Sequence, residues 1–139
     1  MLAAALTRLE DEGVEVAAAG PVLLTDPVGP SSRRYANSAA VIATALEPPD
    51  LLTLLKQIER EFGRRPGGRR WTSRVLDLDM ILWSGGAFSG PGLTVPHPLF
   101  RTRDFVLVPA AAIAPRWRDP ITGLTVRQLR FRLRHSRLS

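Results

Sequence analysis

Two aspartates, Asp77 and Asp79, stand two positions apart in an otherwise apolar run over residues 75–83. The branched and aromatic residues of this run predict a buried strand, in which side chains alternate between the two faces. Both carboxylates would then point the same way, with Cα atoms about 6.5 to 7 Å apart. Two carboxylates at that spacing can bind one divalent metal ion or hold a pair of ions. Surface salt bridges are the alternative interpretation of the same pair.

A cluster of arginines precedes the aspartates. Carboxylates on an apolar strand are costly to bury unless positive charge compensates them, and either magnesium ions or guanidinium groups supply that charge. Guanidinium groups also bind phosphate oxygens in pairs. The sequence therefore predicts a metal and phosphate site beside a core formed by Leu76, Leu78, Met80 and Leu82 on the opposite face. The arginines that surround the glycine-rich stretch 64–73 are Arg64, Arg65, Arg69, Arg70 and Arg74.

Composition limits the possibilities. The 139 residues predict a single domain over residues 1–139, and the absence of cysteine excludes disulfides and thiolate catalysis. The net charge of +6 comes almost wholly from arginine, which favours an anionic partner: a nucleic acid or a small phosphorylated ligand. The apolar runs are too short to span a bilayer, and the N-terminal region is acidic at residues 10–12. We therefore expect a cytoplasmic protein without a membrane partner.

The elements that must position the aspartates follow the order helix, strand, strand, helix, strand, helix. We predict helices over 2–12, 48–63 and 105–113, with Pro109 in the first turns of the last of these. Residues 124–133 fit either a helix or a strand, and we favour a helix. Turn-forming residues predict loops over 25–35 and 64–73 and a hairpin connection over 84–92 that leads into an extended piece at 93–96. The strands are expected at 14–24, 36–46 and 75–83, the first two antiparallel, in a layered α+β domain.

The order of four motifs carries a resemblance to a known family. RRWTSRVLDLDMILW at 69–83 and LTVPHPLFRTRDFVLVPAAAIAP at 93–115 follow TDPVGP at 25–30 and YAN at 35–37. Together they resemble the 6-hydroxymethyl-7,8-dihydropterin pyrophosphokinases of folate biosynthesis. The resemblance implies a ferredoxin-like two-layer sandwich with a mainly antiparallel sheet. It also implies a Mg²⁺-dependent diphosphokinase that transfers diphosphate from ATP to the hydroxymethyl group of the pterin and releases AMP.

The resemblance assigns roles to particular residues. Asp77 and Asp79 would hold two Mg²⁺ ions, and Asp79 would also help to orient or deprotonate the attacking hydroxyl. Arg64 and Arg74 would contact the transferred phosphates and complete the catalytic set. The ATP-binding residues implied by the resemblance are Glu59, Trp71, Met80, Leu93, Thr94, His97 and Arg103. The pterin-binding residues are Thr25, Val28, Tyr35, Asn37 and Phe105, of which the two aromatic rings would sandwich the heterocycle and the amide would read its edge.

The chain also departs from the family pattern. The family opens with a strand and a glycine-serine-asparagine turn before its first helix, whereas this chain starts at that helix. We therefore expect a domain truncated at its N-terminus relative to the family, acting as a monomer on ATP and the pterin rather than on nucleic acid. Two alternatives stay open: a small basic nucleic-acid-binding domain, suggested by the net charge of +6, and an inactive truncated relative that still folds.

Overall fold

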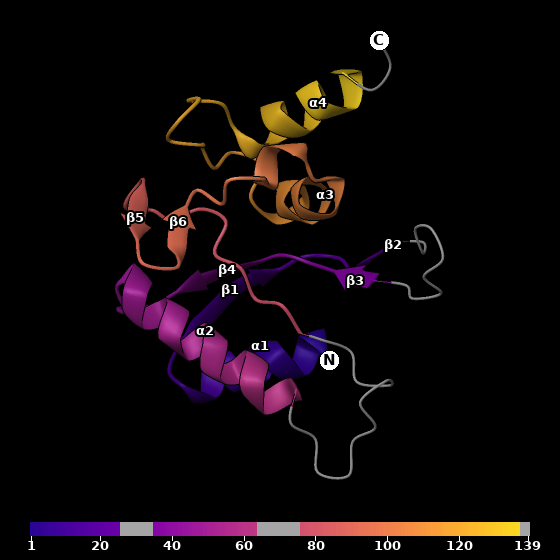
Figure 1. Cartoon of the computed structure of the whole chain (residues 1–139). Coiled ribbons are helices and arrows are strands. Elements are labelled where there is room, and N and C mark those ends of the chain that lie inside the picture. Colours follow the sequence, from indigo (N-terminus) through magenta and orange to yellow (C-terminus); the bar gives the residue numbers. More distant parts are fainter. Residues whose placement is uncertain (26–34, 64–75, 137–139) are drawn as a thin grey trace.

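The computed structural model of the chain describes residues 1–25, 35–63 and 76–136. Helices on both sides enclose a central group of antiparallel strands (Figure 1). Helices α1 (Leu2–Asp11) and α2 (Pro48–Gly63) lie on one side of strands β1 (Glu15–Ala19) and β4 (Ala40–Ala43), and α3 (Asp104–Ile113) and α4 (Val126–Ser136) lie on the other. The mixed helical and antiparallel character agrees with the predicted α+β class.

Each pair of strands forms its own two-stranded sheet in the described part of the chain. β1 pairs with β4 through a register shift between Val16 and Ala18, and β2 (Leu23–Thr25) pairs with β3 (Tyr35–Asn37). The predicted strands 14–24 and 36–46 are therefore antiparallel, as expected, but each is divided in two. One cause lies at Gly20, whose amide donates to the Ala39 carbonyl at 2.8 Å and whose Cα faces the backbone of α3.

Two hydrophobic cores hold the layers together. The first core lies between α1, α2 and the β1–β4 pair, where Leu9, Leu55 and Ile58 are buried. Its helical stripe at Leu51, Leu55 and Ile58 follows the spacing predicted for residues 48–63. The second core lies between α3, α4 and the short 3₁₀ helix η1 (Phe100–Thr102), and its buried members are Phe100, Leu107, Val126 and Leu129. Residues 124–133 therefore adopt the favoured helix from Val126 onward.

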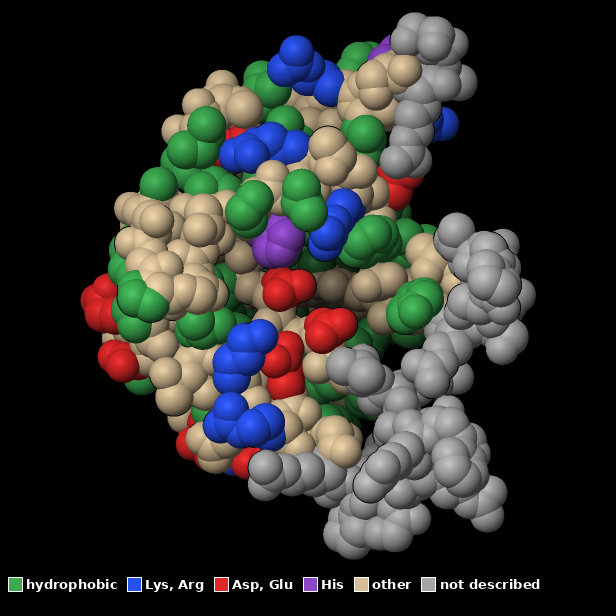
Figure 2. Space-filling view, viewed as in Figure 1, with side chains coloured by type: hydrophobic (Ala, Val, Ile, Leu, Met, Phe, Trp, Pro, Cys, Tyr) green, Lys and Arg blue, Asp and Glu red, His purple; other side chains and the backbone are tan. Residues whose placement is uncertain are grey.

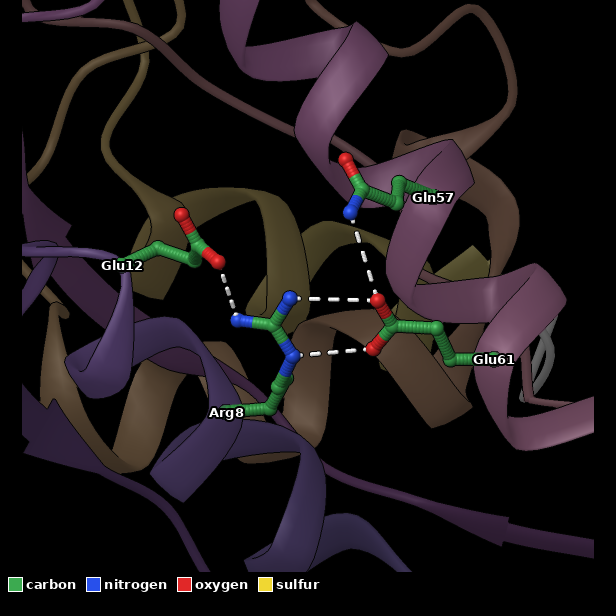
Figure 3. Close-up of polar contacts among 4 residues, drawn as sticks. All are labelled: Arg8, Glu12, Gln57 and Glu61. Atoms are coloured by element: carbon green, nitrogen blue, oxygen red, sulfur yellow. Dashed lines mark hydrogen bonds and ion pairs between the residues drawn. The ribbon is translucent and has the colours of Figure 1, made fainter.

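A polar bridge joins the two helices on the outer side of the first core (Figure 3). Arg8 of α1 donates through Nε to Glu61 Oε2 at 2.8 Å and through Nη2 to Glu61 Oε1 at 3.1 Å. Its Nη1 atom contacts Glu12 Oε1 at 2.5 Å, and Gln57 donates to Glu61 at 3.3 Å. The Arg8 guanidinium lowers the pKa of the Glu61 carboxyl because it stabilises the ionised form. This bridge connects α1 and α2 at the surface of the protein.

Three predictions about elements were wrong. Residues 76–82 form no strand. Within the described residues, their backbone hydrogen-bonds to the His97 amide and to the Glu59 side chain, and not to a neighbouring strand. The hairpin lies further along the chain, between β5 (Phe88–Gly90) and β6 (Leu93–Val95), with Gly92 at a φ of 69° in its turn. Pro109 stands in the interior of α3 and is buried, not in the first turns.

None of the described helices is both long and apolar enough to cross a membrane.

Candidate active site

The segment 76–82 carries the two aspartates along the boundary between the two cores. Leu76 is buried, and Leu78 and Met80 pack against the first core. Asp77 and Asp79, between them, are exposed. The alternation predicted from the sequence is therefore confirmed, although the strand is not. The burial of Leu76, Leu78 and Met80 gives the physical reason: three apolar side chains fix one side of the segment and leave the carboxylates on the other.

Glu59 of α2 holds the middle of this segment. The Leu78 amide, which lies between the two aspartates in sequence, donates to Glu59 Oε2 at 2.6 Å. The other carboxylate oxygen of Glu59 lies 3.2 Å from Lys56 Nζ, and the Glu59 side chain is only 15% exposed. Glu59 was predicted to bind ATP, but both of its carboxylate oxygens already contact other groups of the protein.

His97 lies beside the end of the same segment. Its backbone amide donates to the Ile81 carbonyl at 3.0 Å, which joins the loop after β6 to the aspartate segment. The ring Nδ1 accepts a hydrogen bond from the Leu99 amide at 3.2 Å. The neutral ring must therefore carry its proton on Nε2, which makes that atom a donor for an anionic ligand. The sequence motif that contains His97 thus lies next to the aspartates in space.

Arg103 and Phe105 lie at the start of α3. The Arg103 guanidinium carbon stands 5.4 Å from the centre of the Phe105 ring, so one face of the ring carries a cation. The predicted phosphate contact and the predicted pterin contact are therefore neighbours. In the face of the molecule that Figure 2 shows, a histidine side chain lies near the middle and acidic side chains lie directly below it. Basic side chains lie above the histidine and below the acidic side chains.

The predicted pterin residues of the described strands lie on the β2–β3 pair. Tyr35 is 57% exposed and stands opposite Thr25, whose hydroxyl donates to the Tyr35 carbonyl at 3.3 Å. Asn37 is half-buried opposite Leu23. Because α3 packs against β2 and β3, the strand that carries Tyr35 and Asn37 lies close to the helix that begins beside Phe105.

The remaining predicted residues divide into two groups. Leu93 is buried in β6 and Met80 packs against the first core, so their side chains have structural surroundings, whereas Thr94 is exposed. Four predicted residues lie outside the described ranges: Val28, Arg64, Trp71 and Arg74.

Magnesium fits the donor chemistry of the aspartates. Within residues 1–25, 35–63 and 76–136, no group of three or more histidine and carboxylate side chains is arranged to hold a metal ion alone. Mg²⁺ is usually bound through one or two carboxylates, with water and substrate phosphates completing its shell. Asp77 and Asp79, exposed on one segment, have the carboxylate oxygens that such a site uses.

Sequence reasoning missed a buried ion pair that fixes the loop before α3. Asp119 is fully buried and receives hydrogen bonds from Arg101 Nε at 2.5 Å and Nη2 at 2.8 Å. The Thr122 hydroxyl and the Ile121 amide also donate to it, at 2.7 Å and 3.0 Å. The Asp-Pro sequence followed by threonine and glycine signals a turn. Nothing local identifies Arg101, 18 residues away, as the partner.

A groove of about 720 Å³ runs along α4, away from the predicted site residues. Its lining includes Arg127, Arg130 and Arg134 together with Phe131, which is 61% exposed. None of the predicted site residues lines it. The arginines of α4 therefore form a basic surface along this groove.

Comparison with known proteins identifies the relatives of the chain. The family model described as 7,8-dihydro-6-hydroxymethylpterin-pyrophosphokinase matches residues 1–115. A 2-amino-4-hydroxy-6-hydroxymethyldihydropteridine pyrophosphokinase of Synechocystis is 40% identical over 117 residues, which cover 84% of this chain and 60% of the relative. The protein of the same name from Pseudomonas aeruginosa is 42% identical over 104 residues, covering 74% and 64%.

A third relative of the same name, from Methylorubrum extorquens, matches over a longer stretch. It is 39% identical over 130 residues, which cover 92% of this chain and 80% of the relative. The chain spans less than two thirds of the length of the Synechocystis and Pseudomonas relatives. The match to the family model ends at residue 115, before the turn that contains Asp119 and before α4.

Proposed function

This chain belongs to the 7,8-dihydro-6-hydroxymethylpterin-pyrophosphokinase family, and on that basis we propose that it transfers diphosphate from ATP to the hydroxymethyl group of 6-hydroxymethyl-7,8-dihydropterin. The transfer forms a bond between the pterin hydroxyl oxygen and the β-phosphorus, breaks the bond between the α and β phosphates, and releases AMP. The hydroxyl proton leaves to a nearby base or to water. The product belongs to folate biosynthesis.

Asp77 and Asp79 would hold Mg²⁺, and two ions are the number we propose. The bound metal would neutralise phosphate charge and orient the reacting oxygens, which is the main requirement of phosphoryl transfer. The exposure of both carboxylates, beside the buried Leu76 and the half-buried Leu78, supports this assignment. Asp79 would also orient the attacking hydroxyl or accept its proton.

His97 and Arg103 would bind the phosphates of ATP. The Nδ1 atom of His97 already accepts from the Leu99 amide, which leaves the Nε2–H group to donate to a phosphate oxygen. Arg103 is a permanent cation held near the Phe105 ring. Thr94 adds an exposed hydroxyl, and Met80 and Leu93 support the adenine side through backbone groups. Arg64, Arg74 and Trp71 are proposed for the phosphates from family resemblance alone.

Tyr35, Asn37 and Phe105 would bind the pterin. An exposed phenol ring on β3 and a second ring at the start of α3 suit a flat heterocycle placed between the two elements. The Asn37 amide offers a donor and an acceptor side by side, which complement the amino-pyrimidinone edge. Thr25 would contribute beside Tyr35, with which it pairs, and Val28 is proposed from the motif.

The proposal includes a ferredoxin-like arrangement of α1, β1, β4, α2 and the aspartate segment. The antiparallel β1–β4 pair and the two helices on one side of it support that arrangement. We further propose that the protein works as a cytoplasmic monomer.

The observation that carries the function is the pair of exposed aspartates on an anchored segment in a chain of this family. The test measures AMP formation from ATP and Mg²⁺ with and without the hydroxymethyl-dihydropterin. It uses this chain and a version extended by its upstream coding sequence. AMP that appears only with the pterin supports the proposal, and its absence from both proteins overturns it. Activity in the extended version alone identifies this chain as the inactive, truncated relative.

A further inference from the structure

The hydrogen bond between Glu59 and Leu78 joins α2 directly to the aspartate segment. The Leu78 amide belongs to the peptide bond that follows Asp77, and Asp79 follows Leu78 in the chain. Its N–H group donates to Glu59 Oε2 at 2.6 Å. A bond from an amide to an ionised carboxylate is shorter and stronger than a bond between neutral groups. Fixing this one amide therefore restrains the backbone from which both aspartates project.

The surroundings of Glu59 leave little room for a role as a ligand of nucleotide. One of its oxygens accepts from Leu78 and the other lies 3.2 Å from Lys56 Nζ. The side chain is 15% exposed, compared with 52% for Lys56. A nucleotide hydroxyl could reach Glu59 only through the small exposed part of a carboxylate whose two oxygens already have partners in the protein.

No strand neighbour replaces this anchor in the described part of the chain. Within the described residues, the backbone of 76–82 makes two hydrogen bonds to other segments: the Ile81 carbonyl accepts from the His97 amide, and the Leu78 amide donates to Glu59. A strand would be held by several bonds on each side. Here, the packing of Leu76 and Leu78 and the bond to Glu59 must determine the direction of the carboxylates.

We propose that Glu59 is a positioning residue that sets the Asp77–Asp79 pair for metal binding by holding the Leu78 amide. This inference rests on the proposed function, because it assumes that the pair binds Mg²⁺. It replaces the direct contact with ATP that the sequence suggested for Glu59. Groups that orient metal ligands commonly change metal affinity by about 10- to 100-fold when they are removed.

The test separates the length of the side chain from its charge. Glu59→Gln keeps an oxygen acceptor at the same reach without the charge, whereas Glu59→Asp keeps the charge and withdraws it by one methylene. Hydrogen exchange of the Leu78 amide is followed by NMR, and Mn²⁺ binding is followed by electron paramagnetic resonance in the presence of α,β-methylene ATP. We expect Glu59→Asp and Glu59→Ala to speed exchange and to weaken Mn²⁺ binding at least about tenfold.

For Glu59→Gln we expect smaller changes in both quantities than for Glu59→Asp, because an oxygen acceptor remains in place although its bond is weaker than that of the carboxylate. The Kd of the nucleotide analogue without metal should be unchanged in all three variants. Asp50→Ala, which removes an exposed carboxylate from the first turn of the same helix, is the matched control and should change neither quantity.

Two results would overturn the positioning role. One is unchanged Leu78 exchange in Glu59→Asp. The other is metal-free nucleotide binding that weakens in Glu59→Gln and not in Glu59→Asp, which would identify the charge as a nucleotide contact. Failure of the proposed function gives a different pattern: Asp77→Ala would bind Mn²⁺ like the wild type, while the Leu78 exchange still responded to Glu59.

Discussion

Arg101 and Asp119 form a two-bond ion pair that ties the 3₁₀ helix η1 to the turn before α4. The two guanidinium nitrogens lie 2.5 Å and 2.8 Å from the two carboxylate oxygens, and Asp119 is fully buried. Arg103, two residues after Arg101, opens α3 and carries the proposed contact with phosphate. The pair therefore stabilises the frame of the candidate site without touching its ligands.

Replacing Asp119 by alanine should destabilise the protein by about 3 kcal/mol, toward the lower end of the range for broken buried pairs, because Arg101 keeps some access to water. Thr122→Ala removes one hydrogen bond to the same carboxylate and should cost about 1 kcal/mol. Urea unfolding measures both, with Asp11→Ala on the surface of α1 as the control. Equal stabilities of Asp119→Ala and Asp11→Ala would contradict the role of the pair.

The same carboxylate predicts a dependence of stability on pH. The bonds from Arg101 lower the pKa of Asp119 to about 2, because they favour the ionised form. Because the pKa of Asp119 is lower in the folded than in the unfolded protein, ionised Asp119 stabilises the folded state above about pH 4. This stabilisation is lost as the pH falls through about 2. The stability difference between the wild type and Asp119→Asn should therefore shrink by roughly 2 kcal/mol from pH 5 to pH 2. A difference that stays constant over this range would contradict the assignment.

Gly20 lies close to the backbone of α3. A methyl group at its Cα would stand 3.1 Å from the Pro109 carbonyl oxygen and 3.2 Å from the Ala39 carbonyl oxygen, both of which are backbone atoms. Gly20→Ala should therefore cost about 1 to 2 kcal/mol in thermal unfolding, as overpacking does. Gly63→Ala is the control, since in the described part of the chain no atom outside its own helix lies within 4 Å of the added carbon. Equal melting temperatures for the two variants would refute the close contact.

We expect a substitution at Tyr35 to weaken the binding of the pterin and not that of ATP. Tyr35 is 57% exposed on β3, so Tyr35→Ala should leave the fold intact and remove one stacking surface. The loss of about 0.5 to 1.5 kcal/mol raises the KM for the pterin by roughly 2- to 12-fold, while the KM for ATP stays unchanged. Steady-state kinetics with each substrate varied in turn gives both constants. An increase in the KM for ATP alone would place the ring at the other substrate.

The spacing of apolar residues along the sequence correctly predicted which faces of individual segments are buried. The apolar stripe of α2 and the alternation of Leu76, Asp77, Leu78 and Asp79 both follow from burial of one face. The strand predicted at 75–83 failed at residues 76–82 because strand formation needs a partner backbone, which a single segment does not reveal.

The candidate site shows the same limit. The motifs identified the aspartates and His97, and the structure brings them together through the bond between His97 and Ile81. The partners of Glu59 and Asp119 come from positions 19 and 18 residues away, so sequence spacing carried no signal for them. Contacts of this kind are determined by packing and can be read only from the folded chain.

The most direct measurement of the central claim compares pterin-dependent AMP formation in the wild type, Asp77→Asn and Asp79→Asn, in whichever of the two forms of the protein is active. Loss of a carboxylate that holds the metal should lower kcat/KM at least about 100-fold, since bound metal supplies several kcal/mol of charge stabilisation. Asp50→Asn, on the exposed side of α2, should stay within about twofold, because it removes no proposed ligand. Wild-type rates in both Asp77→Asn and Asp79→Asn would contradict the account.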